Sequence, residues 1–232
     1  MDAVTVIITT YDPGDQSRTK LAIKTIEGLR ANLRYPDLRY IIADDGSNQE
    51  THIAPLRDAL EGAQYEISIV DRKGVGVSKN TALRKAFEVS PYVFMLEDDW
   101  YLRETLPLEK YVELMQQRPD LGIVRFGYLG GGMEAEYAGD SLLAYWKLKR
   151  GSGVYIYSGQ VSLRSKAFYD VVGMHAEGLS PGEEELEFCK RFNGTEGAPD
   201  IIWPAALPTM LNSGAFINTG MNVSLNAEVP TT

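Results

Sequence analysis

The sequence predicts an α/β fold in which a mainly parallel sheet is flanked by helices. Short β-branched runs alternate with segments of helical periodicity through the first half of the chain, and acidic or polar residues follow directly after several of the runs. With 232 residues, 44% of them hydrophobic, the chain is long enough to bury one sizeable core. We therefore expect one domain over residues 1–232, with a regular half at 1–126 and a mixed half at 127–232.

Four runs in the regular half are the expected strands. They are Val4–Thr9, Tyr40–Ala43, Tyr65–Val70 and Tyr92–Leu96. β-Branched and aromatic residues are frequent in these runs, and such residues favour strands. Because a helical segment lies between successive runs, the pattern predicts parallel strands covered by helices.

Helical periodicity fills the gaps between these strands. Ser17 is a candidate cap near the start of the first helix. The apolar face of that helix consists of Ala22, Ile23, Ile26, Leu29 and Leu33. Further helices are expected around Ile53–Leu60 and over Ser78–Val89 and Leu106–Gln117.

The mixed half has a different texture. A run at Leu121–Phe126 is followed by three glycines at 130–132, which predict a flexible connection. Shorter strands are expected at Leu142–Lys147, Val154–Tyr157 and Val161–Arg164, and a helix at Glu183–Phe192. No internal repeat or long linker divides the chain, so a single domain remains the expectation.

Composition excludes several classes of protein. The net charge of −9 and the pI near 4.8 have the wrong sign for a protein that holds nucleic acid or anionic lipid mainly through charge. The single cysteine, Cys189, excludes an intramolecular disulfide and a cysteine-based structural zinc site. No run approaches the roughly 18 apolar residues of a membrane span, and the chain opens directly into a strand-like run. We expect a soluble, cytoplasmic protein.

Acidic and polar residues gather after three of the expected strands, where ligands bind in open α/β sheets. These residues are Thr10, Tyr11 and Asp12, then Asp44 and Asp45, then Glu97, Asp98 and Asp99. Unpaired carboxylates that converge at a buried sheet edge repel one another and need a cation or a hydroxyl-rich ligand. A divalent metal together with a nucleotide satisfies that need.

The run from Glu97 to Asp99 is the sharpest of these signals. Hard oxygen ligands at the end of a rigid strand suit Mg²⁺ or Mn²⁺, which would bridge two phosphates. The alternative is that these carboxylates only cap a following helix.

The order of these motifs resembles glycosyltransferase family 2, whose fold is called GT-A. Val4–Tyr11 resembles the family's first strand and nucleotide-facing turn, and Tyr40–Ser47 its second signature, in which Asp45 would contact the base. Glu97–Asp99 matches the Asp-x-Asp metal motif, which implies Asp99 as the metal ligand. The resemblance implies nucleotide-sugar contacts from Thr10, Tyr11, Asp12, Asp44, Asp45, Arg72, Lys79, Asn80, Glu97 and Asp98.

The same resemblance extends to a candidate catalytic base. Pro181–Leu186 resembles the family's Gly-Glu-Asp segment, so Glu184 takes the place of the base and Glu183 that of the preceding Glu. Which member of the 183–185 run is the base stays open, since Glu at a helix N-terminus also complements the helix dipole. Some related enzymes supply a late metal ligand, such as a His, for which Asn218–Gly220 is a weak substitute here.

The expected activity is therefore an inverting, metal-dependent transfer of a sugar from a nucleotide-diphospho-sugar, with a UDP-sugar as the family-level choice, to an acceptor hydroxyl. The half at 1–126 would bind the donor and the half at 127–232 the acceptor, whether glycan, lipid, protein or modified nucleic acid. One alternative is a sugar-phosphate nucleotidyltransferase, but such enzymes have a Gly-rich basic loop after the first strand, and Thr9–Pro13 is not such a loop. The other alternative is a non-catalytic nucleotide-sugar-binding protein. Two roles are open for the aromatic residues of the mixed half: they could form a platform for a sugar ring, or they could pack in the core. These residues are Tyr128, Trp146, Tyr155, Tyr157 and Trp203.

Overall fold

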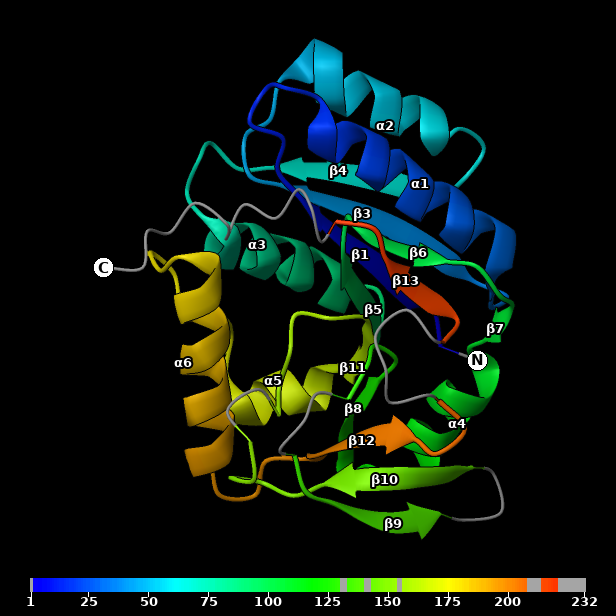
Figure 1. Cartoon of the computed structure of the whole chain (residues 1–232), viewed down its shortest axis with the longest axis vertical. Helices are drawn as coiled ribbons and strands as arrows, with labels where there is room; N and C mark the ends of the chain where they lie inside the picture. The colour runs from blue at the N-terminus through cyan, green and yellow to red at the C-terminus, as the bar shows by residue number, and fades with distance from the viewer. Residues whose placement is uncertain (1, 130–132, 140–142, 154–155, 208–213, 221–232) are drawn as a thin grey trace.

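A computed structural model of the chain describes residues 2–129, 133–139, 143–153, 156–207 and 214–220 (Figure 1). In this part of the chain the central sheet has nine strands, in the order β4-β3-β1-β5-β11-β8-β12-β10-β9. Helices pack on both faces of the sheet, so the α/β prediction is confirmed.

Four strands of the chain's regular half lie parallel in the central sheet. They are β1 (Val4–Thr10), β3 (Leu38–Asp44), β4 (Tyr65–Ile69) and β5 (Tyr92–Glu97). Thr10 pairs with Asp44 and Thr9 with Glu97, so the carboxyl ends of three strands lie level at one edge. These strands match the expected runs to within two residues at each end.

The second half supplies a mixed set of strands. They are β8 (Leu121–Arg125), β9 (Ala135–Gly139), β10 (Ala144–Leu148), β11 (Ser162–Ser165) and β12 (Asp200–Pro204). β11 runs antiparallel to both β5 and β8, whereas β12 is parallel to β8. The expected mixed character is confirmed, but β9 and β12 were not anticipated.

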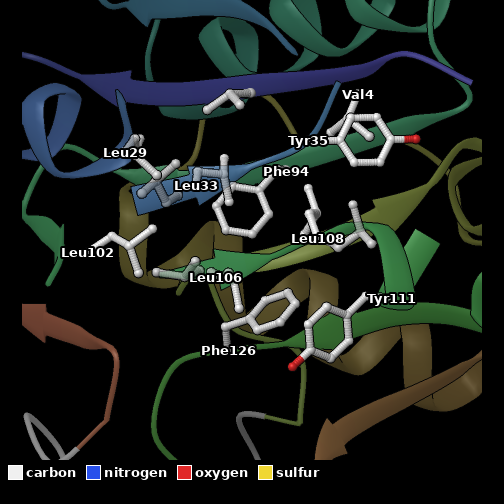
Figure 2. Close-up of a cluster of buried hydrophobic side chains, with 14 of the residues drawn as sticks. Val4, Leu29, Leu33, Tyr35, Phe94, Leu102, Leu106, Leu108, Tyr111 and Phe126 are labelled. Carbon is white, nitrogen blue, oxygen red and sulfur yellow. The ribbon is translucent and has the colours of Figure 1, made fainter. Parts of the chain in front are cut away.

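One face of the sheet is covered by α1 (Ser17–Asn32), α2 (Ala54–Ala59) and α4 (Glu109–Gln117), and a π-helical turn at Gln49–Ile53 leads into α2. Figure 2 shows the cluster of buried side chains on this face, where Phe94 of β5 lies among leucines and Phe126. Tyr111 meets Phe126 edge-on at 4.8 Å between ring centroids. This apolar layer fixes α1 against the sheet.

The opposite face is covered by α3 (Val75–Phe87), α5 (Lys166–Val172) and α6 (Pro181–Gly194), which lie together in Figure 1. Phe168 of α5 packs against Phe188 and Phe192 of α6 at 6.1 and 5.7 Å between centroids. The N-termini of α3 and α6 thereby reach the edge at which β1, β3 and β5 end.

Several expected boundaries were wrong. Leu106–Pro107 forms the short strand β7, which pairs with β2 (Leu33–Arg34), so α4 begins only at Glu109. Residues 156 and 157 are not in a strand, while 130–132, 142, 154 and 155 lie outside the described residues. A two-stranded sheet of β6 (Trp100–Leu102) and β13 (Phe216–Asn218) was also unforeseen.

The helices of the fold were compared with the requirements of a membrane span. Among the described residues, no helix combines the length and the apolar character needed to cross a bilayer.

Candidate active site

A cavity of about 380 Å³ opens where the parallel strands end. Residues from β1, β3 and β5 form one wall, and the N-termini of α3 and α6 form the other. Its lining consists of Thr9, Thr10, Tyr11, Arg18, Ala43, Asp45, Gly74, Val75, Ser78, Glu97, Asp98, Asp99, Leu179, Ser180 and Pro181. The edge that the sequence predicted as a ligand site is therefore hollow.

The acidic run at the end of β5 lies in this cavity, as expected. Asp98 and Asp99 are buried, and Thr10 Oγ1 donates to Asp98 Oδ2 at 2.5 Å. Thr25 of α1 donates to the Asp98 carbonyl at 2.8 Å, which ties the turn after β5 to the helix. Glu97 lines the same cavity, so all three carboxyl groups converge.

Arg18 is a site residue that the sequence reasoning missed. Its guanidinium forms an ion pair with Asp98 Oδ1, and its Nη1 lies 3.4 Å from Asp99 Oδ2. A signal was present, because Arg18 lies four residues before Ala22 and eight before Ile26 on the buried stripe of α1. A charged residue on an apolar stripe requires a buried partner of opposite charge.

Burial perturbs the pKa values of the acidic run. It raises the pKa of Glu97 to about 7, and repulsion from Asp99 acts in the same direction. It raises the pKa of Asp98 to about 6, although Arg18 opposes the change, and it also raises the pKa of Asp99. The cluster therefore carries less than its full negative charge near neutral pH unless additional positive charge enters.

The surroundings of Asp99 fit a divalent cation. Asp99 Oδ1 is buried and has no hydrogen-bond partner in the described part of the chain. Thr219 donates its N–H and its hydroxyl to the Asp99 carbonyl at 2.7 and 3.0 Å, so the segment after β13 lies over the site. Within the described residues no three His, Cys, Asp or Glu side chains are arranged to hold an ion by themselves. A cation at Asp99 would thus need oxygen ligands from a bound donor or from water.

Asp45 and Tyr11 face the cavity from the ends of β3 and β1. Asp45 accepts the Gly74 N–H at 2.9 Å, which links β3 to the start of α3. The guanidinium of Arg72 lies 4.6 Å from the centroid of the Tyr11 ring. Gly46 adopts a φ of 89°, and a Cβ there would lie 3.0 Å from the backbone nitrogen of Arg72. Glycine therefore permits this close turn.

Asp12 and Asp44 shape the cavity wall but do not line it. Asp12 accepts backbone N–H groups of Gly14, Gln16, Arg18 and Thr19, and so takes the capping role that was expected of Ser17. Asp44 accepts the N–H groups of Gly46 and Ser47 at 2.9 and 2.8 Å. Both carboxylates are used to hold turns, which is the ordinary role of Asp in such positions.

Lys79 and Asn80 also lie outside the cavity lining. Lys79 Nζ lies 2.7 Å from Glu184 Oε2, and both side chains are buried. Asn80 forms two hydrogen bonds of 2.9 Å with the backbone of His175. These two residues connect α3 to α6 and to the segment before it.

The three glutamates at the start of α6 have three different environments. Glu183 accepts the N–H and hydroxyl of Ser180 at 3.0 and 2.6 Å, which is a capping contact at the surface. Burial alone would raise the pKa of Glu184, but Lys79 and His175 outweigh it and lower the pKa to about 2. Glu185 accepts the Gly159 N–H at 2.6 Å.

Glu185 is the member of this run that neighbours the acidic cluster. A Cβ placed on Gly159 would lie 3.0 Å from Glu97 Oε1 and 3.8 Å from Glu185 Oε1. Glu184, in contrast, is fully buried and hydrogen-bonded on both oxygens. This arrangement does not suit Glu184 to a base that must reach a substrate.

The aromatic residues weighed for a sugar platform have different surroundings, and Tyr128 is half-buried and packs against the core. Tyr157 and Trp203 are buried in the core, and Trp203 Nε1 donates to the Gly127 carbonyl at 3.2 Å. Trp146 is half-buried and meets the exposed ring of Tyr137 edge-on at 5.2 Å. Tyr155 lies outside the described residues. Core packing therefore accounts for Tyr157 and Trp203.

The chain shares the fold of GT-A glycosyltransferases, an α/β sheet that here has a carboxylate-lined cavity at its strand ends. Residues 5–174 match the family described as "Glycosyl transferase family 2". The chain belongs to glycosyltransferase family 2. A search of curated proteins gave no match.

Solved structures show the same fold at low sequence identity. The structure of S. aureus TarS 1-349 is 15% identical with a TM-score of 0.64, covering 94% of this chain and 60% of that one. The mannosyltransferase PcManGT from Pyrobaculum calidifontis, in complex with GDP-Man and Mn²⁺, is 16% identical with a TM-score of 0.59, covering 87% and 54%. The chain thus spans about three fifths of the length of the TarS structure.

Proposed function

We propose that this chain transfers a sugar from a nucleotide-diphospho-sugar to an acceptor hydroxyl, with inversion at the anomeric carbon and with Mn²⁺ or Mg²⁺ as cofactor. The observation that carries the proposal is the convergence of Glu97, Asp98 and Asp99 in one cavity with Tyr11 and Asp45. A UDP-sugar is the donor to test first, since S. aureus TarS 1-349 has been solved with UDP-GlcNAc, and a GDP-sugar follows from PcManGT.

Each wall of the cavity has a part in donor binding. Tyr11 and Asp45 would contact the nucleoside, because they line the cavity from the ends of β1 and β3, whereas the acidic run follows β5. Arg18 offers a guanidinium that can pair with the diphosphate. Asp98 would face the ribose or the sugar.

Asp99 would hold the metal through Oδ1, for which the described part of the chain supplies no hydrogen-bond partner. When bound, the ion supplies a positive charge that offsets the charge developing on the leaving diphosphate. The protein's own contribution is a buried carboxylate whose backbone is fixed by Thr219.

Glu185 replaces Glu184 in our assignment of the base. An inverting transfer requires a carboxylate that accepts the acceptor's proton on the side opposite the leaving group. Glu185 lies beside Glu97, which lines the cavity, whereas the carboxylate of Glu184 is held by Lys79 and His175 in the interior.

The test compares wild-type protein with Asp99→Ala for donor hydrolysis, which requires no knowledge of the acceptor. We expect Mn²⁺-dependent release of nucleoside diphosphate from the wild type and a loss of about 100-fold or more in the variant. Asp58→Ala is a matched control, because Asp58 is an exposed residue of α2 and its loss changes the net charge equally. Full activity of Asp99→Ala would remove the metal role. Conversion of the nucleotide-sugar and added pyrophosphate to a nucleoside triphosphate and a sugar 1-phosphate would instead indicate a nucleotidyltransferase.

A further inference from the structure

Arg18 occupies the place beside Asp98 and Asp99 at which a cation is expected. We propose that Arg18 is an internal counter-ion that keeps a free divalent cation weakly bound until the donor's diphosphate arrives, so that cation and diphosphate bind cooperatively. This inference rests on the proposed function, because it describes how the same cavity takes up its two ligands.

The contacts of Arg18 place its charge between the two carboxylates. Nη2 pairs with Asp98 Oδ1, Nε lies 3.3 Å from Asp98 Oδ2, and Nη1 lies 3.4 Å from Asp99 Oδ2. The guanidinium side chain is only 10% exposed. A planar fork that engages one carboxylate with two nitrogens is the strong form of this ion pair.

The backbone of Arg18 is also held in place. Its N–H donates to Asp12 Oδ2 at 3.0 Å at the start of α1. Thr10, which donates to Asp98, further fixes the partner carboxylate. The ion pair therefore has fixed anchors on both sides, and a cation entering the site meets it in this arrangement.

A dication that binds Asp99 alone must lie near this guanidinium. Arg18 cannot lose its proton at any ordinary pH, so the repulsion between the two positive charges is not relieved by titration. Repulsion of this kind is strong in a site from which water is largely excluded. Free Mn²⁺ should therefore bind weakly, even though Asp99 Oδ1 has no hydrogen-bond partner within the described residues.

A diphosphate changes this balance. Arg18 lines the same cavity as Tyr11 and Asp45, so a nucleoside diphosphate placed there offers the guanidinium a second anionic partner. The phosphates also bring negative charge that offsets the repulsion between Arg18 and the dication. By linkage, each ligand then raises the affinity for the other by the same factor.

The experiment measures Mn²⁺ affinity from free-Mn²⁺ electron paramagnetic resonance, without nucleotide and with saturating UDP, at a pH of about 8 where carboxyl groups are ionised in water. Wild type is compared with Arg18→Gln and Arg18→Met. We expect both variants to bind Mn²⁺ alone about tenfold more tightly than wild type does. The factor by which UDP raises the Mn²⁺ affinity should fall by the same amount. Lys85→Met is the matched control, since Lys85 pairs with Glu66 outside the cavity and its loss changes the net charge equally.

The Gln variant guards against misfolding, because its amide still donates a hydrogen bond to Asp98 when the Met side chain cannot. Mn²⁺ affinity in Arg18→Gln no tighter than in wild type, or an unchanged gain from UDP, overturns the proposal. Failure of the proposed function looks different, because wild-type protein would then bind neither UDP nor GDP in the presence of Mn²⁺.

Discussion

The ammonium of Lys79 on α3 lies 2.7 Å from the carboxylate of Glu184 on α6, and both side chains are buried. His175 closes the group through its Nδ1, and burial lowers the pKa of His175 to about 4 despite Glu184. The pair joins two helices whose N-termini line the cavity. It also fixes the residue that precedes Glu185, so it has a positioning role at the site.

Lys79→Met should destabilise the fold, because it leaves Glu184 as a buried charge without its cation. We expect a loss of about 3–5 kcal/mol in the free energy of unfolding, measured by urea denaturation. Lys85→Met breaks the partly exposed pair with Glu66 and should cost less than about 1 kcal/mol. Equal losses in the two variants would contradict the structural role of Lys79.

Substitutions of the three glutamates at the start of α6 should affect either the stability of the fold or the rate of sugar transfer, but not both equally. Glu185→Gln is expected to keep the fold and donor binding but to lose about 100-fold or more in transfer rate, since the base is gone. Glu183→Gln should leave transfer unchanged and weaken only the helix cap, by about 0.5–1 kcal/mol. Glu184→Gln should show mainly lowered stability.

Three measurements on each of these variants identify the base: the transfer rate, the donor affinity by thermal shift and the midpoint of urea unfolding. A Glu184→Gln protein of wild-type stability with lost transfer would return the base to Glu184. The proposed base would also fail if Glu185→Gln transferred sugar at the wild-type rate.

Glu97 should make the stability of the metal-free protein fall as pH rises. Its folded pKa of about 7 lies above the ordinary carboxyl value, so the folded state binds more protons between about pH 4 and pH 7. Glu97→Gln removes this effect, and its stability relative to wild type should increase by about 1–2 kcal/mol from pH 5 to pH 7.5. This is less than the full shift implies, because the residue is partly exposed.

His175 acts in the opposite direction over part of this range. Its folded pKa is lowered to about 4, so its contribution is present above its unfolded value near 6.5 and is lost as pH falls toward 4. Because wild type and Glu97→Gln both retain His175, the difference between their urea-unfolding free energies cancels the contribution of His175 and reports Glu97 together with its repulsion of Asp99. A difference that does not change with pH would contradict the expectation.

Gly220→Ala should weaken the cation site without disturbing the core. A Cβ on Gly220 would lie 2.2 Å from Asp99 Oδ2, so either the carboxylate or the segment after β13 must move. We expect Mn²⁺ affinity in the presence of UDP to fall about tenfold, measured by thermal shift at several Mn²⁺ concentrations. Gly182→Ala is the control, since a Cβ there meets no atom within 4 Å.

The regular half of the fold was predictable because its signals are local. The apolar runs of β1, β3, β4 and β5 alternate with helical periodicity, and that alternation specifies parallel strands with helices on both faces. The acidic run after β5 was likewise visible as carboxylates at a strand end. In contrast, β12 lies beside β8 through pairing of residues about 80 positions apart, and no local pattern specifies that partner.

The sequence alone determined the parallel part of the sheet, its ligand-binding edge and the convergence of Glu97, Asp98 and Asp99 on it, because strand ends in a parallel sheet meet at one edge whatever surrounds them. Only the tertiary structure decided the partners of those carboxylates: Arg18 from α1 at Asp98 and Asp99, Thr219 at the Asp99 backbone, and Glu185 rather than Glu184 beside Glu97. Neighbours of this kind depend on how helices pack across the sheet, and burial and charge pairing are properties of that packing.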